Sequence, residues 1–341
     1  MTSDTSNAPA TARSGDQSAA AGDARRPLTG PWRFVPGFGR PTARFVHRWA
    51  IALLVANVGI VATGGAVRLT GSGLGCPTWP RCTDTSFVPH QALGYHGVIE
   101  FGNRMLTWVL IAIAIATWVA VWRRAGSTRA DRRLATVLAL GIPFQGVIGG
   151  ITVLTDLNPW VVALHFLLSM ALVSGSTVLV HRTRPYPDTE VAAPEPSSAQ
   201  RLGRYLSWLT YLVTWVTIYL GTVVTGSGPH AGDADAPRNG LAPDHATQLH
   251  ADAVFVLIGL SVALVVFTRV LGVPQQRTAL TFVGLLAVQG VIGVVQYVTD
   301  LPILLVILHM AGSAALLIGA TWLILEFAPS RKHDREPQPI G

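Results

Sequence analysis

Eight apolar runs divide this chain, and each is long enough to cross a lipid bilayer. A transmembrane helix needs about 20 mostly apolar residues, because the hydrocarbon core of a bilayer is about 30 Å thick. Half of the 341 residues are apolar, only 13% are charged and the mean hydropathy is +0.43, which excludes an ordinary soluble domain. The sequence therefore predicts an all-α integral membrane protein with eight transmembrane helices. The runs lie at roughly 46–66, 97–121, 134–154, 160–180, 205–225, 247–268, 278–298 and 303–327.

Arginine placement predicts the orientation of these helices. The connections after the second, fourth and sixth runs carry eleven arginines, and the opposite connections carry three. Cytoplasmic loops of membrane proteins are enriched in Lys and Arg, so we expect a multi-pass protein of the cell (plasma) membrane with both termini cytoplasmic. These loops and anionic lipid headgroups explain the net charge of +7 without a nucleic-acid partner.

Composition divides the chain into five parts. Residues 1–43 are rich in Ala, Ser, Thr, Asp and Pro and contain no apolar run, which predicts a disordered cytoplasmic tail and not a cleaved signal peptide. Residues 44–182 and 204–328 contain four apolar runs each, and a cytoplasmic linker at 183–203 joins these halves. We expect residues 329–341 to form a second cytoplasmic tail.

The two halves share one long motif. It reads QGVIGGITVLTDLNPWVVALH from Gln145 to His165 and QGVIGVVQYVTDLPILLVILH from Gln289 to His309, with a constant offset of 144 residues. Each half has an even number of spans, so both halves enter the membrane in the same sense. The predicted fold is therefore two four-helix bundles related as parallel repeats about an axis along the membrane normal.

Another histidine in the second half indicates what the duplicated histidine does. His250 lies near the outer end of the sixth run, and His309 lies near the outer end of the eighth. Two neutral imidazoles facing each other across a four-helix bundle are the usual way to hold a haem iron from both sides. Zinc would require three or four ligands, which this half does not offer. A lone membrane histidine can also be a hydrogen-bonded packing residue, so that alternative stays open for His165.

The first half has the same arrangement with one ligand altered. His165 is retained, but Asn103 stands where the alignment of the second and sixth runs places His250. Glu100 precedes Asn103 by about one turn, and Arg104 is near enough to pair with Glu100. This pair forms either a salt bridge that locks helices together or a polar site facing the bundle interior. One histidine with an acid beside it suggests chemistry, whereas two histidines suggest electron transfer.

The only two cysteines lie in the first outer loop. Five residues, two of them proline, separate Cys76 from Cys82. The predicted outer compartment permits a disulfide, which is the expected pairing, and two free thiols are the alternative. A zinc pair is less favoured, because only His90 and His96 lie close by.

These features together resemble the haem A synthase family. They are eight spans in two halves, a cysteine pair in the first outer loop, a TGSG exit at 70–73 and 225–228, the Glu-x-x-x-Arg pattern from Glu100, and histidines on the fourth, sixth and eighth runs. The resemblance covers roughly residues 46–327. It implies an enzyme that oxidises the methyl group of haem O to the formyl group of haem A, the prosthetic group of haem-copper terminal oxidases.

The resemblance also implies a role for each candidate residue. It assigns haem b to the second half, substrate haem O to the first half, and an acid that stabilises or relays charge beside the methyl group to the second run. The residues in these roles are His250 and His309 for haem b, His165 for haem O, Glu100 for the catalytic acid, and Cys76 and Cys82 for the loop disulfide.

One position departs from the family's pattern. The family commonly has histidine immediately before the arginine of the second run, where this chain has Asn103. Either His165 alone holds the substrate iron and leaves the other face open, or His96 supplies a second ligand. We favour the first, because seven residues of helix displace His96 by about 10 Å along the axis.

Two other functions fit parts of the pattern. A haem b-binding membrane electron-transfer subunit without methyl oxidation would need two ligands in each half, and Asn103 argues against it. A transporter would also have repeated halves with intramembrane polar residues, but here the repeats are parallel and no broken midplane helix is evident. Membrane lipid and haem O are the expected partners; a haem O synthase, oxidase assembly factors and a homo-oligomer are left open.

Overall fold

The structure is a computed structural model that describes residues 37–185 and 198–328. Within these residues it consists of helices and loops, and eight helices are long and apolar enough to cross a membrane. The all-α fold class and the eight predicted spans are therefore confirmed. The helices are α1 (Ala43–Leu69), α2 (Gly94–Arg123), α3 (Arg129–Leu154), α4 (Pro159–Arg182), α5 (Ser198–Ser227), α6 (Pro243–Val270), α7 (Gln276–Val298) and α8 (Ile303–Glu326), with a short 3-10 helix, η2 (Gln91–Leu93), before α2.

The predicted tails and linker fall mostly outside the part of the chain that the structure describes. The described residues begin at Gly37, so they include only the end of the predicted tail at 1–43. They omit the predicted tail at 329–341 and most of the predicted linker at 183–203. The division of the chain into these five parts therefore stays a prediction.

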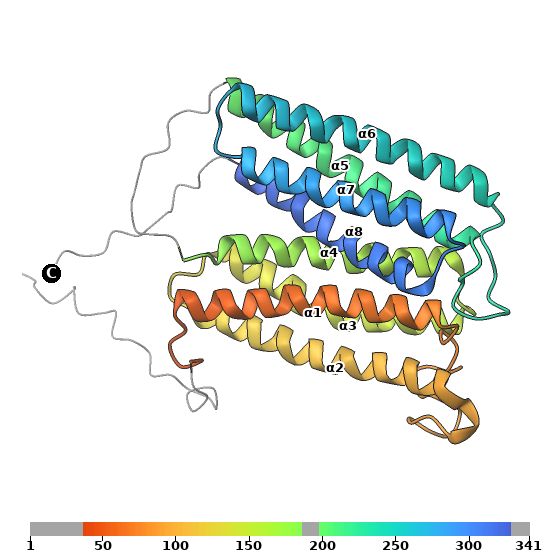
Figure 1. The fold of residues 1–341 in the computed structure, drawn as a ribbon. Coiled ribbons are helices and arrows are strands. Elements are labelled where there is room, and N and C mark those ends of the chain that lie inside the picture. Colours follow the sequence, from red (N-terminus) through yellow and green to blue (C-terminus); the bar gives the residue numbers. More distant parts are fainter. Residues whose placement is uncertain (1–36, 186–197, 329–341) are drawn as a thin grey trace, which may run out of the picture.

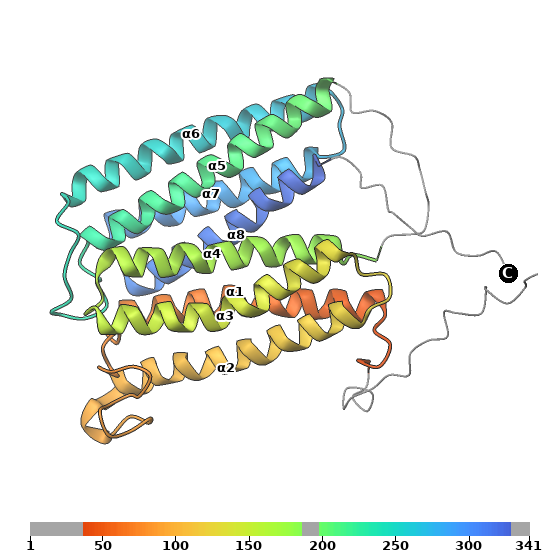
Figure 2. The same cartoon turned by 180° about the vertical axis from the view of Figure 1, so that it is seen from behind.

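The eight helices form two groups of four (Figure 1). In one group α1 packs on α2, α2 on α3, α3 on α4 and α4 on α1; in the other α5 packs on α6, α6 on α7, α7 on α8 and α8 on α5. The groups meet where α4 and α1 pack on α8 and where α4 packs on α5, as the view from behind also shows (Figure 2). This arrangement is consistent with two four-helix bundles.

The long loops that leave α1 and α5 lie at the same end of the molecule (Figure 1). They contact each other directly: Arg68 Nε donates to the carbonyl oxygen of His230 at 2.8 Å, and the Gly73 N–H donates to the carbonyl oxygen of Gly232 at 2.8 Å. Equivalent loops must lie at one end if both halves enter the membrane in the same sense. The arrangement is therefore consistent with a parallel repeat.

Local sequence signals fix the ends of the helices that carry the duplicated motif. Thr128 and Asp131 form a reciprocal capping box at the start of α3. Asn158 caps α4 with its side-chain oxygen, and Pro159 occupies the first turn, where its missing N–H leaves no helical bond unmade. These caps set the depth of His165, about two turns along α4.

The corners between α3 and α4 and between α7 and α8 have the same unusual backbone. Asp156 and Leu157 have φ of 50° and 58°, and Asp300 and Leu301 have φ of 61° and 58°. In each corner the leucine N–H donates to a carbonyl of the preceding helix at 2.8 Å. Non-glycine residues rarely adopt positive φ, so two consecutive ones in both corners show that the repeat extends to the backbone conformation.

A buried hydroxyl cluster joins the two bundles. The Ser174 Oγ of α4 lies 2.9 Å from the Tyr211 hydroxyl of α5 and 3.0 Å from the Thr321 Oγ1 of α8. Apolar side chains surround this cluster, among them Met170, Ile218 and Leu317. Hydrogen bonds between membrane helices stabilise the fold because the alternative is an unpaired polar group in apolar surroundings.

We expect Ser174→Ala to destabilise the packing of the two bundles by about 1 kcal/mol, because it removes two interhelical hydrogen bonds. The matched control is Ser207→Ala, since Ser207 is fully buried but bonds only to the Arg204 carbonyl of its own helix. Reversible unfolding in mixed micelles with increasing denaturing detergent measures the difference. Equal stability of the two variants would contradict the interhelical role of Ser174.

Candidate functional site

The structure brings His250 of α6 and His309 of α8 together in the second bundle. Their ring centres lie 6.4 Å apart, and the ring planes are inclined at 73°. His250 Nδ1 lies 3.0 Å from the Thr217 carbonyl oxygen, which can only accept, so Nδ1 carries the proton and Nε2 keeps its lone pair. A neutral imidazole whose second nitrogen is held by a carbonyl is the form in which histidine binds metals.

Glycine residues on neighbouring helices make room for the imidazoles. A Cβ added at Gly293 of α7 would lie 3.0 Å from His309 Cε1, and one added at Gly221 of α5 would lie 3.2 Å from His250 Cε1. In the first bundle, a Cβ at Gly149 of α3 would lie 3.4 Å from Cε1 of the α4 histidine. Gly149 and Gly293 occupy the same position of the duplicated motif, so this use of glycine belongs to the repeat.

The duplicated glutamine holds the backbone of the duplicated histidine. Gln145 Nε2 donates to the His165 carbonyl oxygen at 2.9 Å, and Gln289 Nε2 donates to the His309 carbonyl oxygen at 2.6 Å. Gln145 also bonds to Ser169 Oγ at 2.5 Å. This bond fixes the histidine helix against the preceding helix in both halves.

The donor set of the second bundle fits a haem iron. A metal–nitrogen bond of about 2 Å on each side, plus the radius of each ring, places two axial imidazole centres about 6 Å apart, close to the observed 6.4 Å. Nδ1 of both His165 and His309 is buried and has no hydrogen-bond partner among the described residues. A buried polar atom without a partner costs free energy, so each of these Nδ1 atoms is open to a bound group.

The first bundle lacks the second imidazole. Asn103 of α2 occupies the position that aligns with His250, and its Oδ1 accepts a hydrogen bond from Thr63 Oγ1 of α1 at 2.8 Å. The side chain at this position is thus held by the first helix of its half in both bundles, by Thr63 in one and by the Thr217 carbonyl in the other.

His96 lies at the outer end of α2. Its Nδ1 is 2.9 Å from Ser72 Oγ, and its ring centre is 3.9 Å from the ring centre of Tyr95. The His96 side chain lines an outer pocket together with Gly71 and Asp233. These contacts hold His96 at the outer loops.

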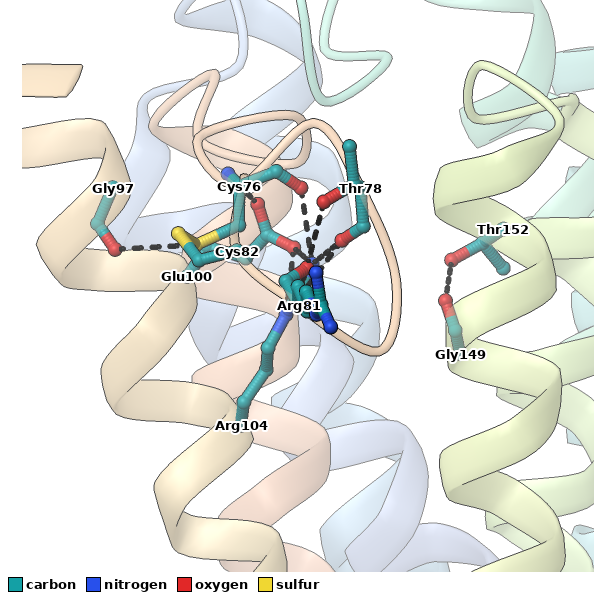
Figure 3. A network of polar contacts seen from close by, with 9 residues as sticks. All are labelled: Cys76, Thr78, Arg81, Cys82, Gly97, Glu100, Arg104, Gly149 and Thr152. Carbon is teal, nitrogen blue, oxygen red and sulfur yellow. Dashed lines mark hydrogen bonds and ion pairs between the residues drawn. A yellow bond between two sulfur atoms is a disulfide. The ribbon is translucent and has the colours of Figure 1, made fainter. Parts of the chain in front are cut away.

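Glu100 and Arg104 form the predicted ion pair, with Arg104 Nη2 2.5 Å from Glu100 Oε1. The second carboxylate oxygen, Oε2, accepts the Cys76 N–H at 2.6 Å. Glu100 is only 6% exposed. The pair therefore joins α2 to the loop that follows α1 (Figure 3), whereas the sequence suggested either a link between helices or a site open to the bundle interior.

The predicted disulfide between Cys76 and Cys82 is present, with both residues fully buried. The loop between them carries Trp79, which the sequence analysis did not single out. A Cβ added at Gly150 would overlap the Trp79 ring, so the ring packs on the α3 backbone. A signal was available: Gly150 in the first copy of the motif is Val294 in the second.

Comparisons with known proteins agree with this picture. Residues 47–321 match the family COX15-CtaA, described as cytochrome oxidase assembly protein. The chain is similar to the heme A synthases of Lysinibacillus sphaericus (30% identical, covering 53% of this chain and 58% of the relative) and Staphylococcus saprophyticus (27%, covering 52% and 58%). It is also similar to the heme A synthase of Shewanella oneidensis (26%, covering 79% and 93%). The first two alignments span somewhat more than half the length of those relatives.

Proposed function

Because the chain belongs to the COX15-CtaA family of cytochrome oxidase assembly proteins, we propose that it is a haem A synthase. This membrane oxidoreductase converts the methyl group of haem O to the formyl group of haem A through two successive oxidations and loss of water. The observation that supports this function best is the asymmetry within one repeated frame, with an imidazole pair in the second bundle and a single imidazole in the first. We also propose that it lies in the cell membrane with both termini cytoplasmic.

We assign haem b to the second bundle, where His250 and His309 would hold its iron. When bound there, it supplies one-electron transfer. His250 presents Nε2 because its Nδ1 donates to the Thr217 carbonyl. Gln289 fixes the backbone of His309, and Gly293 leaves space for its ring.

We assign substrate haem O to the first bundle, with His165 as the single protein ligand to its iron. Gln145 and Gly149 position His165 as their counterparts position His309. Haem iron in proteins is held by His, Cys, Met or Tyr, so Asn103 would not serve as a second ligand. A site with one histidine ligand would suit a substrate haem, and a site with two would suit a resident redox cofactor.

Glu100 carries the acid role in this proposal. Its two oxygens accept hydrogen bonds from the Cys76 N–H and the Arg104 guanidinium. A fixed carboxylate suits electrostatic stabilisation of positive charge near the reacting methyl group better than it suits proton transfer.

The direct test is haem extraction with mass analysis from a host that makes haem O but no haem A, with and without this protein. We expect haem A only when the protein is present. We expect His165→Ala to abolish haem A production and to leave the visible absorption of haem b in the second bundle unchanged. Unchanged haem O beside protein that carries haem b would refute the proposal and favour an electron-transfer subunit.

We expect Asn103→His to convert the iron bound in the first bundle from high-spin to low-spin, because the new imidazole would close its open face. Electron paramagnetic resonance and visible absorption of the haem-loaded protein measure the change. The matched control is the reverse exchange, His250→Asn, which should turn the second-bundle haem high-spin. A low-spin first-bundle haem in the unaltered protein would contradict single-histidine ligation, and loss of that signal in His96→Ala would identify His96 as the second ligand.

We expect Gly293→Ala to weaken haem b binding about 5- to 150-fold and so to lower haem b occupancy, since crowding of a packed site typically costs about 1–3 kcal/mol. The added Cβ would lie 3.0 Å from His309 Cε1. Gly290→Ala is the control, because a Cβ at Gly290 meets nothing within 4 Å. Haem content per protein, from the pyridine haemochrome spectrum, measures occupancy. Equal haem content in both variants would show that Gly293 does not set the position of His309.

A further inference from the structure

Arg104 bonds to the first outer loop at three carbonyls. Its Nη1 and Nη2 donate to the carbonyl oxygens of Cys76, Thr78 and Arg81 at 3.0–3.1 Å (Figure 3). Its Nε and Nη2 also donate to Glu100 Oε1. The planar guanidinium thus spans both ends of the disulfide-closed segment, and the carboxylate fixes the orientation of that plane.

The segment held in this way carries Trp79 to α3. The Trp79 ring covers the backbone of Gly150, which is buried, and Trp79 as a residue is 36% exposed. Gly149, the preceding residue of α3, borders the imidazole of His165. The loop is anchored on α2 and the ring lies on α3, so Trp79 connects these two helices one residue away from the glycine that borders His165.

The second bundle has none of these features. At the positions that align with Glu100, Arg104 and Gly150 it has Thr247, Ala251 and Val294. Its outer loop contains no cysteine, and the Val294 side chain is 64% exposed. The Glu100–Arg104 pair and Trp79 therefore occur only in the first bundle, which has Asn103 where the second bundle has His250.

We propose that Trp79 forms a wall of the first-bundle haem pocket between α2 and α3, and that Arg104, oriented by Glu100, is the positioning residue that holds it there. The inference rests on the proposed function, because it names the substrate porphyrin as the group that the ring contacts. A flat apolar macrocycle gains from an indole at its edge or face. An arginine is required because lysine cannot reach three carbonyls from one rigid plane.

The test is titration of the detergent-solubilised protein, with haem b in the second bundle, with haem O followed by visible absorption. We expect Trp79→Ala and Arg104→Lys to weaken binding to the first bundle roughly three- to tenfold, the size of one aromatic contact. The control is Trp108→Phe, since Trp108 lies on α2 but is 66% exposed. An unchanged haem b spectrum verifies that each variant is folded. Wild-type affinity in Trp79→Phe and Trp79→Ala would overturn the inference.

A double-mutant cycle tests whether Arg104 acts through Trp79. Residues that act on one contact are not additive, so the Arg104→Lys/Trp79→Ala variant should bind haem O no more weakly than Trp79→Ala alone. Additive losses would overturn the positioning role. The titration needs no turnover, so a protein that binds haem O but makes no haem A would refute the proposed function and leave this inference standing.

Discussion

Both sites depend on one hydrogen bond, in which a glutamine side chain donates to the backbone carbonyl of a histidine on the following helix. Gln145 and Gln289 each make it. In a bilayer the backbone must satisfy its own polar groups, so spanning segments are helical and side-chain polar groups are few. An amide that bonds across two helices therefore has a large influence on their relative position. Together with the left-handed corners after α3 and α7, it fixes the height and rotation of His165 and His309.

The glutamine, the left-handed corner and the histidine are common to both halves. The difference between the two sites therefore comes from a few other positions. The first bundle has Asn103 where the second has an imidazole, and it has Gly150, which admits an indole from the outer loop, where the second has valine. Neither change disturbs the glutamine, the corner or the histidine of the motif. The two bundles therefore share the glutamine, the corner and the histidine and differ in the side chains around that histidine.

The sequence predicted the eight helices, the disulfide and the repeat, because hydropathy, cysteine number and a gapless alignment are properties of the chain itself. It also placed Glu100 beside Arg104, since i and i+4 residues share a helix face. It did not predict that Cys76 N–H and three loop carbonyls complete their bonding. Those contacts depend on how a loop without regular structure folds back on α2, and no periodicity reports that. Thr63, which holds Asn103, was missed because that contact depends on how α1 packs on α2, and the spacing of residues along one helix does not show which residue of another helix it meets.

The bond from Thr63 determines which atoms of the Asn103 amide remain available to other partners. Because the hydroxyl donates to Oδ1, the amide oxygen is engaged on α1 and the Nδ2 hydrogens remain for other partners. In the second bundle the Thr217 carbonyl engages the proton on His250 Nδ1 and leaves the Nε2 lone pair. The same position on the second helix of each half therefore presents opposite chemistry, a lone pair in one bundle and hydrogen-bond donors in the other. An imidazole lone pair can bind a metal ion, whereas an amide N–H group can only donate a hydrogen bond.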